Sequence, residues 1–121
     1  MNDAPSARDA ALLLDMFLAA RDARDFVRDF DESAFLASRL HQSAVIRTLE
    51  ILGEAAGNVS SQFQSAHPEI PWREMIGMRH RLIHAYAEVR LDLVWIVVED
   101  RLDPLIAALA PLIPGPDAPK P

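Results

Sequence analysis

Residues 44–56, with the sequence AVIRTLEILGEAA, carry apolar residues at the three- and four-residue spacing of a helix that buries one face. Arg47, Glu50 and Glu54 stand at positions i, i+3 and i+7, so they share a second, polar face. The segment therefore predicts an amphipathic helix packed against other helices. Its apolar face is expected to consist of Val45, Ile46, Leu49, Leu52 and Ala56.

The composition of the whole chain agrees with a helical fold. Half of the 121 residues are hydrophobic, with alanine and leucine dominant, and only 7% are aromatic. A β-sandwich would be richer in valine, isoleucine, threonine and tyrosine. The length suits one compact domain, and the sequence shows neither a strand pattern nor an internal repeat. We therefore predict an all-α bundle of four or five helices.

Turn and capping residues set the expected helix limits. Asp31 is expected to cap the start of the second helix, and Asp92 the start of the last helix. Gly57-Asn58 is expected to end the second helix. Residues 1–113 are expected to form one domain, followed by a disordered proline-rich tail at 114–121. The expected helices cover residues 6–28, 34–56 with a bend near Ser38, a short turn within 59–66, 71–88 beginning at Pro71, and 92–113 with a kink or restart at Asp103-Pro104.

Charge, cysteine content and the N-terminus limit the functional class. The formal net charge of −6 argues against a general nucleic-acid coat protein, although it allows a local basic site. The absence of cysteine excludes disulfides and thiolate metal sites. The first residues lack the basic region of a signal peptide, and charged residues interrupt the apolar stretch at 91–113. We therefore predict a cytoplasmic protein without a membrane span.

Residues 77–86, with the sequence GMRHRLIHAY, concentrate two arginines, two histidines and a tyrosine. In a helix, His80 and His84 point the same way, whereas Arg79 and His84 are about 140° apart. One straight helix cannot aim both Arg79 and His84 at one small ligand. Either the arginine stem reaches round the helix, or two copies of the helix meet and build the site together. The opposite, core-facing stripe is expected to consist of Trp72, Met75, Ile76, Arg79, Ile83 and Tyr86.

Three interpretations of this segment are open. In the first, the helix is structural, Arg79 pairs with Glu50 or Glu54, and the histidines lie on the surface. In the second, His80 and His84 bind zinc as an i, i+4 pair, although no third ligand is evident and the neighbouring arginines would repel a cation. In the third, arginine clamps a phosphate and histidine transfers protons while an RNA 2′-hydroxyl attacks, so that no metal is required.

The chain resembles the HepT-like family of HEPN-domain proteins, the toxin half of a bacterial toxin–antitoxin pair. The family signature is an Arg-x4-His-x-Tyr run, which stands here as Arg79, His84 and Tyr86. The resemblance runs from about Phe30 to Leu109, and more weakly through the first helix. Three further stretches match in order and spacing, namely residues 44–56, Ile70-Pro71-Trp72 and Val94-Trp95-Ile96-Val97-Val98.

The resemblance implies a fold, an activity and partners. The fold would be a helical bundle that forms a homodimer, with two Arg-x4-His motifs meeting at a cleft between subunits. The activity would be that of a metal-independent endoribonuclease without a cofactor, in which Arg79 holds the phosphate and His84 acts as general acid/base. The antitoxin would be a small nucleotidyltransferase of the MNT type that transfers AMP to Tyr86. The added bulk and negative charge would block RNA.

One position departs from the family pattern. Family members usually carry a small polar residue, often asparagine, directly after the arginine, where this chain has His80. A second imidazole could assist proton transfer or disturb the site, so His80, Glu54 and Arg47 are candidate auxiliary residues. The alternative is a non-catalytic binding or regulatory subunit of an MNT-type nucleotidyltransferase. A basic cluster that frames the cleft is expected from Arg47, Arg73, Arg79, Arg81 and Arg90.

Overall fold

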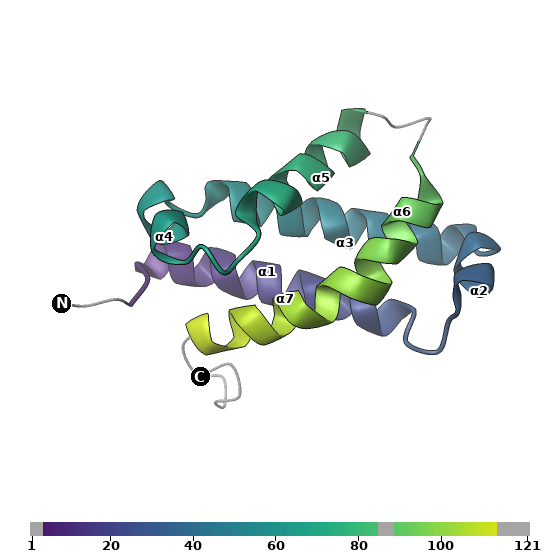
Figure 1. The fold of residues 1–121 in the computed structure, drawn as a ribbon, viewed down its shortest axis with the longest axis horizontal. Coiled ribbons are helices and arrows are strands. Elements are labelled where there is room, and N and C mark those ends of the chain that lie inside the picture. The colour runs from purple at the N-terminus through teal and green to yellow at the C-terminus, as the bar shows by residue number, and fades with distance from the viewer. Residues whose placement is uncertain (1–3, 85–88, 114–121) are drawn as a thin grey trace.

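The computed structural model describes residues 4–84 and 89–113, and every regular element within these ranges is helical. The prediction of an all-α fold is confirmed (Figure 1). The expected disordered tail at 114–121 lies outside the described residues. In chain order the elements are α1 (Ala7–Phe26), α2 (Glu32–Leu36), α3 (Arg39–Asn58), α4 (Ser61–Ala66), α5 (Trp72–His84), α6 (Leu91–Ile96), the π-helix η2 (Val97–Arg101), α7 (Leu102–Leu109) and the 3-10 turn η3 (Ala110–Leu112).

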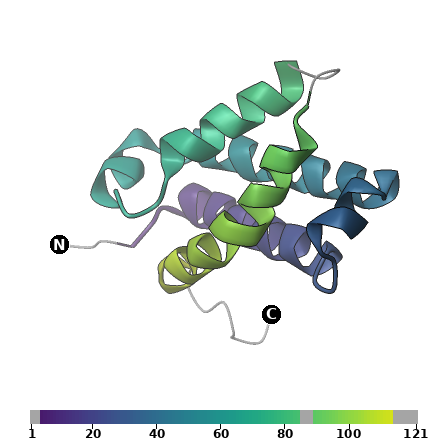
Figure 2. The ribbon, with the colours of Figure 1, turned by 45° about the vertical axis from the view of Figure 1, so that its right-hand side comes forward.

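Three long elements and one interrupted arm form the bundle. Helices α1 and α3 run antiparallel and side by side, and α5 packs on α3 (Figures 1 and 2). The continuous run of α6, η2 and α7, here called the C-terminal arm, crosses this layer and packs on α1 through α7. The short helix α2 closes one end by contacting both α3 and α6. No helix of the described residues is long and apolar enough to span a membrane.

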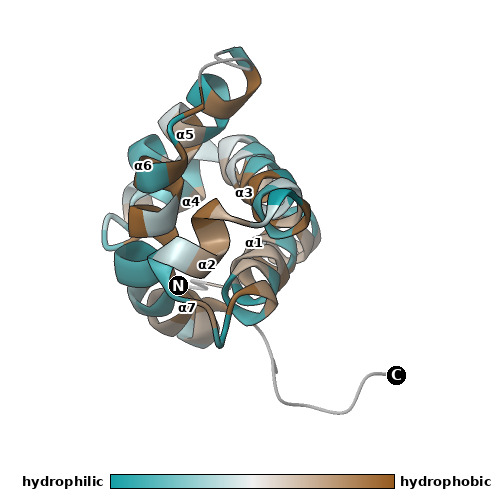
Figure 3. Cartoon of the chain, turned by 90° about the vertical axis from the view of Figure 1, so that its right-hand side faces the viewer, coloured by the Kyte–Doolittle hydropathy of each residue, from teal (hydrophilic) through white to brown (hydrophobic). Residues whose placement is uncertain are grey.

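The core is built from one stripe of each long helix. Hydrophobic and hydrophilic residues are mixed along every long helix, as expected for helices that bury a single face (Figure 3). The predicted apolar face of α3 is confirmed, with Ile46 half-buried and the other four residues buried. From α1, the buried residues that join the same core are Leu13, Met16, Phe17, Ala19, Ala20 and Ala23.

The expected bend near Ser38 is a complete break between α2 and α3. The Ser38 hydroxyl accepts a hydrogen bond from the His41 N–H (3.3 Å) and caps the start of α3. The Gln42 amide donates to the carbonyl oxygens of Phe35 (3.0 Å) and Leu36 (3.1 Å), at the end of α2. Side chains thus replace the backbone hydrogen bonds that a continuous helix would make here. Asp31 caps α2 as predicted, by accepting from the Ala34 N–H (2.8 Å).

The C-terminal arm differs from the sequence expectation in its cap. Arg90, not Asp92, is the residue that precedes α6, and Asp92 lies in the first turn. The helix restarts at Leu102, whose N–H donates to the carbonyl of Val97 five residues earlier. Pro104 lacks an N–H and its ring would clash with the carbonyl of Asp100 in a regular α-helix. The wider π turn directly before α7 therefore accommodates the proline.

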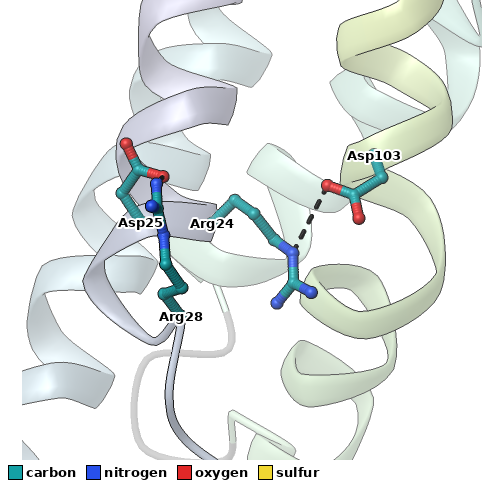
Figure 4. Close-up of polar contacts among 4 residues, drawn as sticks. All are labelled: Arg24, Asp25, Arg28 and Asp103. Carbon is teal, nitrogen blue, oxygen red and sulfur yellow. Dashed lines mark hydrogen bonds and ion pairs between the residues drawn. The ribbon is translucent and has the colours of Figure 1, made fainter.

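Polar contacts near both of its ends tie α1 to distant parts of the chain. Near its start, the Asp9 side chain accepts from the Ser60 N–H (2.9 Å) and the Ser60 hydroxyl (2.6 Å), and Asp9 is only 4% exposed. Near its end, the Arg24 Nε lies 3.3 Å from Asp103 of α7, while Arg28 pairs with Asp25 (Figure 4). No local sequence pattern predicts this role of Asp9, because its partner lies 51 residues away.

Replacing Asp9 by asparagine should lower the free energy of unfolding by about 2 kcal/mol, since the amide nitrogen cannot accept from Ser60 and a charge-assisted hydrogen bond is lost. Urea denaturation followed by circular dichroism measures the change. Asp15→Asn is the matched control, because Asp15 is an exposed acid of the same helix. Equal unfolding midpoints for the two variants would contradict this role of Asp9.

Candidate functional site

Helix α5 carries the candidate acid–base residues. It begins at Trp72, one residue after the predicted start at Pro71. The Trp72 Nε1 donates to the carbonyl of His67 (2.9 Å), and Trp72 packs edge-on against Phe63 of α4. Trp72 and the neighbouring Ile70 are both buried. The apolar Ile70-Pro71-Trp72 segment thus anchors the start of α5 to the loop before it.

The buried stripe of α5 is rotated relative to the sequence prediction. Trp72 and Met75 are buried as predicted, but Ile83 is 38% exposed, and Met78 and Leu82 are buried in its place. The rotation turns Met78 and Leu82 toward cavities beside the C-terminal arm. Periodicity alone could not choose between two adjacent apolar stripes of one helix, because both satisfy the helical spacing.

Arg79 lies at the edge of the interface between α5 and α3 and is half-buried. Its Cβ lies against Gly53 of α3, and Ile76, one turn earlier, lies against Gly57. The buried, core-facing residues of α3 and α5 lie on one side of the line that joins these two contacts. Helical geometry therefore places the polar face of α3 on the same outer surface as the Ile76 edge of α5. That polar face includes the candidate auxiliary residues Arg47 and Glu54.

The expected ion pair of Arg79 does not form within the described residues. Glu50 pairs with Arg47 of its own helix (3.5 Å), and Glu54 is exposed with no ion-pair partner within residues 4–84 and 89–113. Arg79 likewise has no carboxylate partner in these ranges. The first interpretation, in which α5 is purely structural, predicted an ion pair between Arg79 and Glu50 or Glu54. That part of the interpretation is therefore wrong. The guanidinium of Arg79 is left available to an anionic ligand.

His80 and His84 form an exposed imidazole pair one helical turn apart. Their ring centroids are 4.4 Å apart and the rings are tilted by 53°. The predicted common direction of the two side chains is confirmed. Within the described part of the chain, no group of three or more histidine, cysteine, aspartate or glutamate residues could hold a metal ion. The zinc interpretation therefore gains no third ligand from these residues.

The single chain leaves Arg79 and His84 on different sides of α5. The helix stays α-helical through His84, so the two side chains leave it about 140° apart. Arg79 faces the edge of α3, whereas His84 is exposed. Tyr86, the expected modification site, lies outside the described residues.

The predicted basic cluster is divided by local ion pairs. Arg90 binds both carboxylate oxygens of Asp92, at 3.1 and 2.7 Å. This hydrogen-bonded guanidinium lowers the pKa of Asp92 below its ordinary value, so the pair persists at neutral pH. Arg47 pairs with Glu50, whereas Arg73, Arg79 and Arg81 have no carboxylate partner among the described residues. The members of the predicted cluster that lack a carboxylate partner among the described residues therefore all belong to α5.

Two adjoining cavities of about 280 and 270 Å³ lie between α5 and the C-terminal arm, which are also joined by the Glu74–Arg101 ion pair (3.3 Å). Both are lined by Met78, Arg81 and Val97, and neither is lined by Arg79, His80 or His84. The candidate acid–base residues thus lie on an open surface, which suits an extended polymer better than a small enclosed ligand.

Comparison with known proteins identifies the family. A family model described as "Ribonuclease HepT-like" matches residues 16–112. "Putative RNase MJ1380" of Methanocaldococcus jannaschii is 38% identical over 96 residues, which cover 78% of this chain and 88% of the relative. "Probable ribonuclease HepT" of Thermococcus cleftensis is 46% identical over 81 residues, which cover 67% and 74%. No solved structure matches the chain. The resemblance to this family is thus confirmed, and the chain belongs to the HepT-like ribonuclease family.

Proposed function

We propose that the chain is an RNA-cleaving toxin, a metal-independent endoribonuclease in which Arg79 and His84 are the catalytic residues. Membership in a ribonuclease family supports this activity. The assignment of these residues depends on one observation. Within the described residues no carboxylate neutralises the guanidinium of Arg79, and the same helix carries two exposed imidazoles. The cytoplasm is the proposed location of the reaction.

The proposed reaction uses the RNA as its own nucleophile. His84 removes the proton from a 2′-hydroxyl, the 2′-oxygen attacks the adjacent phosphorus, and the bond from phosphorus to the 5′-oxygen breaks. The leaving 5′-oxygen takes up a proton, and the products are a 2′,3′-cyclic phosphate and a 5′-hydroxyl. Arg79 stabilises the negative charge that develops on the phosphate oxygens. His80 lies close enough to His84 to serve as a second proton carrier.

We propose that the active form is a homodimer. Arg79 and His84 of one chain diverge by about 140° around α5, so one subunit alone does not converge them on one phosphate. Two α5 helices that meet through their outer surfaces would bring the Arg79 of one subunit toward the His84 of the other. The same arrangement would place Arg47 and Glu54 at the rim of the cleft.

The direct test is cleavage of a labelled RNA oligonucleotide by purified protein that carries no AMP. His84→Ala and Arg79→Ala should each lower the cleavage rate at least about 100-fold, because each removes a proton carrier or a phosphate clamp. Chelation of metal ions should leave the rate unchanged. His67→Gln is the matched control, since His67 lies in the loop before α5 and stacks on Phe63.

Three results would reject this assignment. They are intact RNA after incubation with the wild-type protein, equal rates for His84→Ala and wild type, and cleavage of an oligonucleotide whose 2′-hydroxyls have been removed. The first result, together with harmless expression of the chain alone, would favour the alternative of a non-catalytic subunit of a nucleotidyltransferase.

We further propose that an MNT-type nucleotidyltransferase antitoxin silences the toxin by transferring AMP to Tyr86. Each transfer should add roughly 329 Da to the intact mass of protein produced together with the antitoxin. Tyr86→Phe should remove the added mass and should arrest growth even when the antitoxin is present. Complete inhibition of an unmodified wild-type chain would instead indicate that the antitoxin masks the site by binding.

A further inference from the structure

Gly53 of α3 lies in close contact with the backbone of α5. A Cβ atom added at Gly53 would lie 2.4 Å from the Cβ of Arg79 and 2.8 Å from the carbonyl oxygen of Met75. Both distances are too short for real atoms. The other described glycines have room, since a Cβ would meet only the Ile76 Cγ1 at 3.7 Å from Gly57 and the Arg81 Nη1 at 3.5 Å from Gly77.

The obstruction at Gly53 comes from parts of α5 that cannot turn away. The Met75 carbonyl belongs to the helix backbone, and the Cβ of Arg79 is fixed to the backbone by one bond. Rotation of a side chain therefore relieves neither contact. An added methyl group can be accommodated only if α5 moves relative to α3 as a body, and that movement carries Arg79 with it.

The same contact restricts the Arg79 side chain at its root. The Cγ of Arg79 would lie 3.4 Å from the Cβ built at Gly53, so the first two carbons of the arginine stem rest on the backbone of α3. No carboxylate holds the far end of the side chain within the described residues. Helix packing thus fixes where the arginine stem leaves α5, and among the described residues no carboxylate competes with a ligand for the guanidinium.

We propose that Gly53 is a positioning residue for Arg79. Because Gly53 has no side chain, α3 packs closely against Arg79 and holds it where it meets the RNA phosphate. This role rests on the proposed ribonuclease function. The physical reason is preorganisation. A phosphate clamp contributes to catalysis only when its donors already stand where charge develops, and a shift of about 1 Å can cost about 100-fold in rate.

The chain supplies its own matched pair of variants for the test. Gly53→Ala should lower kcat for RNA cleavage by roughly 10- to 100-fold, with a smaller change in KM. Gly57→Ala makes the same chemical change one helical turn later on the same interface, where there is room, and should leave kcat unchanged. Equal kcat values for these two variants would overturn the proposal.

A double-variant experiment separates positioning from a general loss of folded protein. In an Arg79→Ala background, which keeps the Cβ that meets Gly53 but has no guanidinium to place, Gly53→Ala should reduce kcat by a smaller factor than it does in the wild type. A general folding defect would instead reduce kcat by the same factor in both backgrounds. That result would overturn the proposal.

A relocation variant tests the idea even if Gly53→Ala does not fold. Arg79→Ala combined with Ile76→Arg keeps Gly53 and moves the guanidinium one turn along the outer edge of α5. Activity as low as that of Arg79→Ala would support a position fixed by Gly53, whereas recovery toward the wild-type rate would overturn it.

A spectroscopic measurement remains informative without cleavage. The Nε–H resonance of Arg79, assigned through Arg79→Lys, should shift in Gly53→Ala and stay in place in Gly57→Ala. If the wild-type protein cleaves no RNA, the proposed function fails, while the resonance still decides whether Gly53 places Arg79. An unmoved resonance in a folded Gly53→Ala protein would overturn the positioning role alone.

Discussion

The contact of α3 with α5 at Gly53 is the constraint on which the candidate site depends. Helix α5 makes its extensive packing contact with α3, whereas its contact with the C-terminal arm is limited by cavities and includes the Glu74–Arg101 ion pair. The direction in which α5 presents Arg79, His80 and His84 is therefore set mainly from one side. Within that contact only a hydrogen atom fits between Gly53 and the Cβ of Arg79.

The remainder of the fold provides a rigid base for this contact. Helices α1 and α3 supply many of the buried core residues, and Asp9 and Arg24 link α1 to Ser60 and Asp103. An acidic chain of net charge −6 can still bind an anionic polymer through such a base if unpaired arginines gather at one place. Helix α5 provides such a place, whereas ion pairs engage the arginines at its flanks.

Local patterns in the sequence predicted most of the elements and the direction of the histidines. The stripe of residues 44–56 predicted the buried face of α3, and the i, i+4 spacing of His80 and His84 predicted their common direction. These features follow from helical geometry within a few residues, so they need no knowledge of neighbours. The family motif also depends only on residues near in sequence, and the comparisons confirmed the family it indicated.

The sequence by itself determined that this protein is a helical bundle of the HepT-like family and which helix bears the candidate acid–base residues. Only the tertiary structure decided which stripe of α5 is buried, that Arg79 lacks a glutamate partner in the described residues, and that Gly53 meets it. The physical reason is that helical periodicity fixes angles around one axis, whereas rotation about that axis and the distance between helices depend on which side chains can pack together.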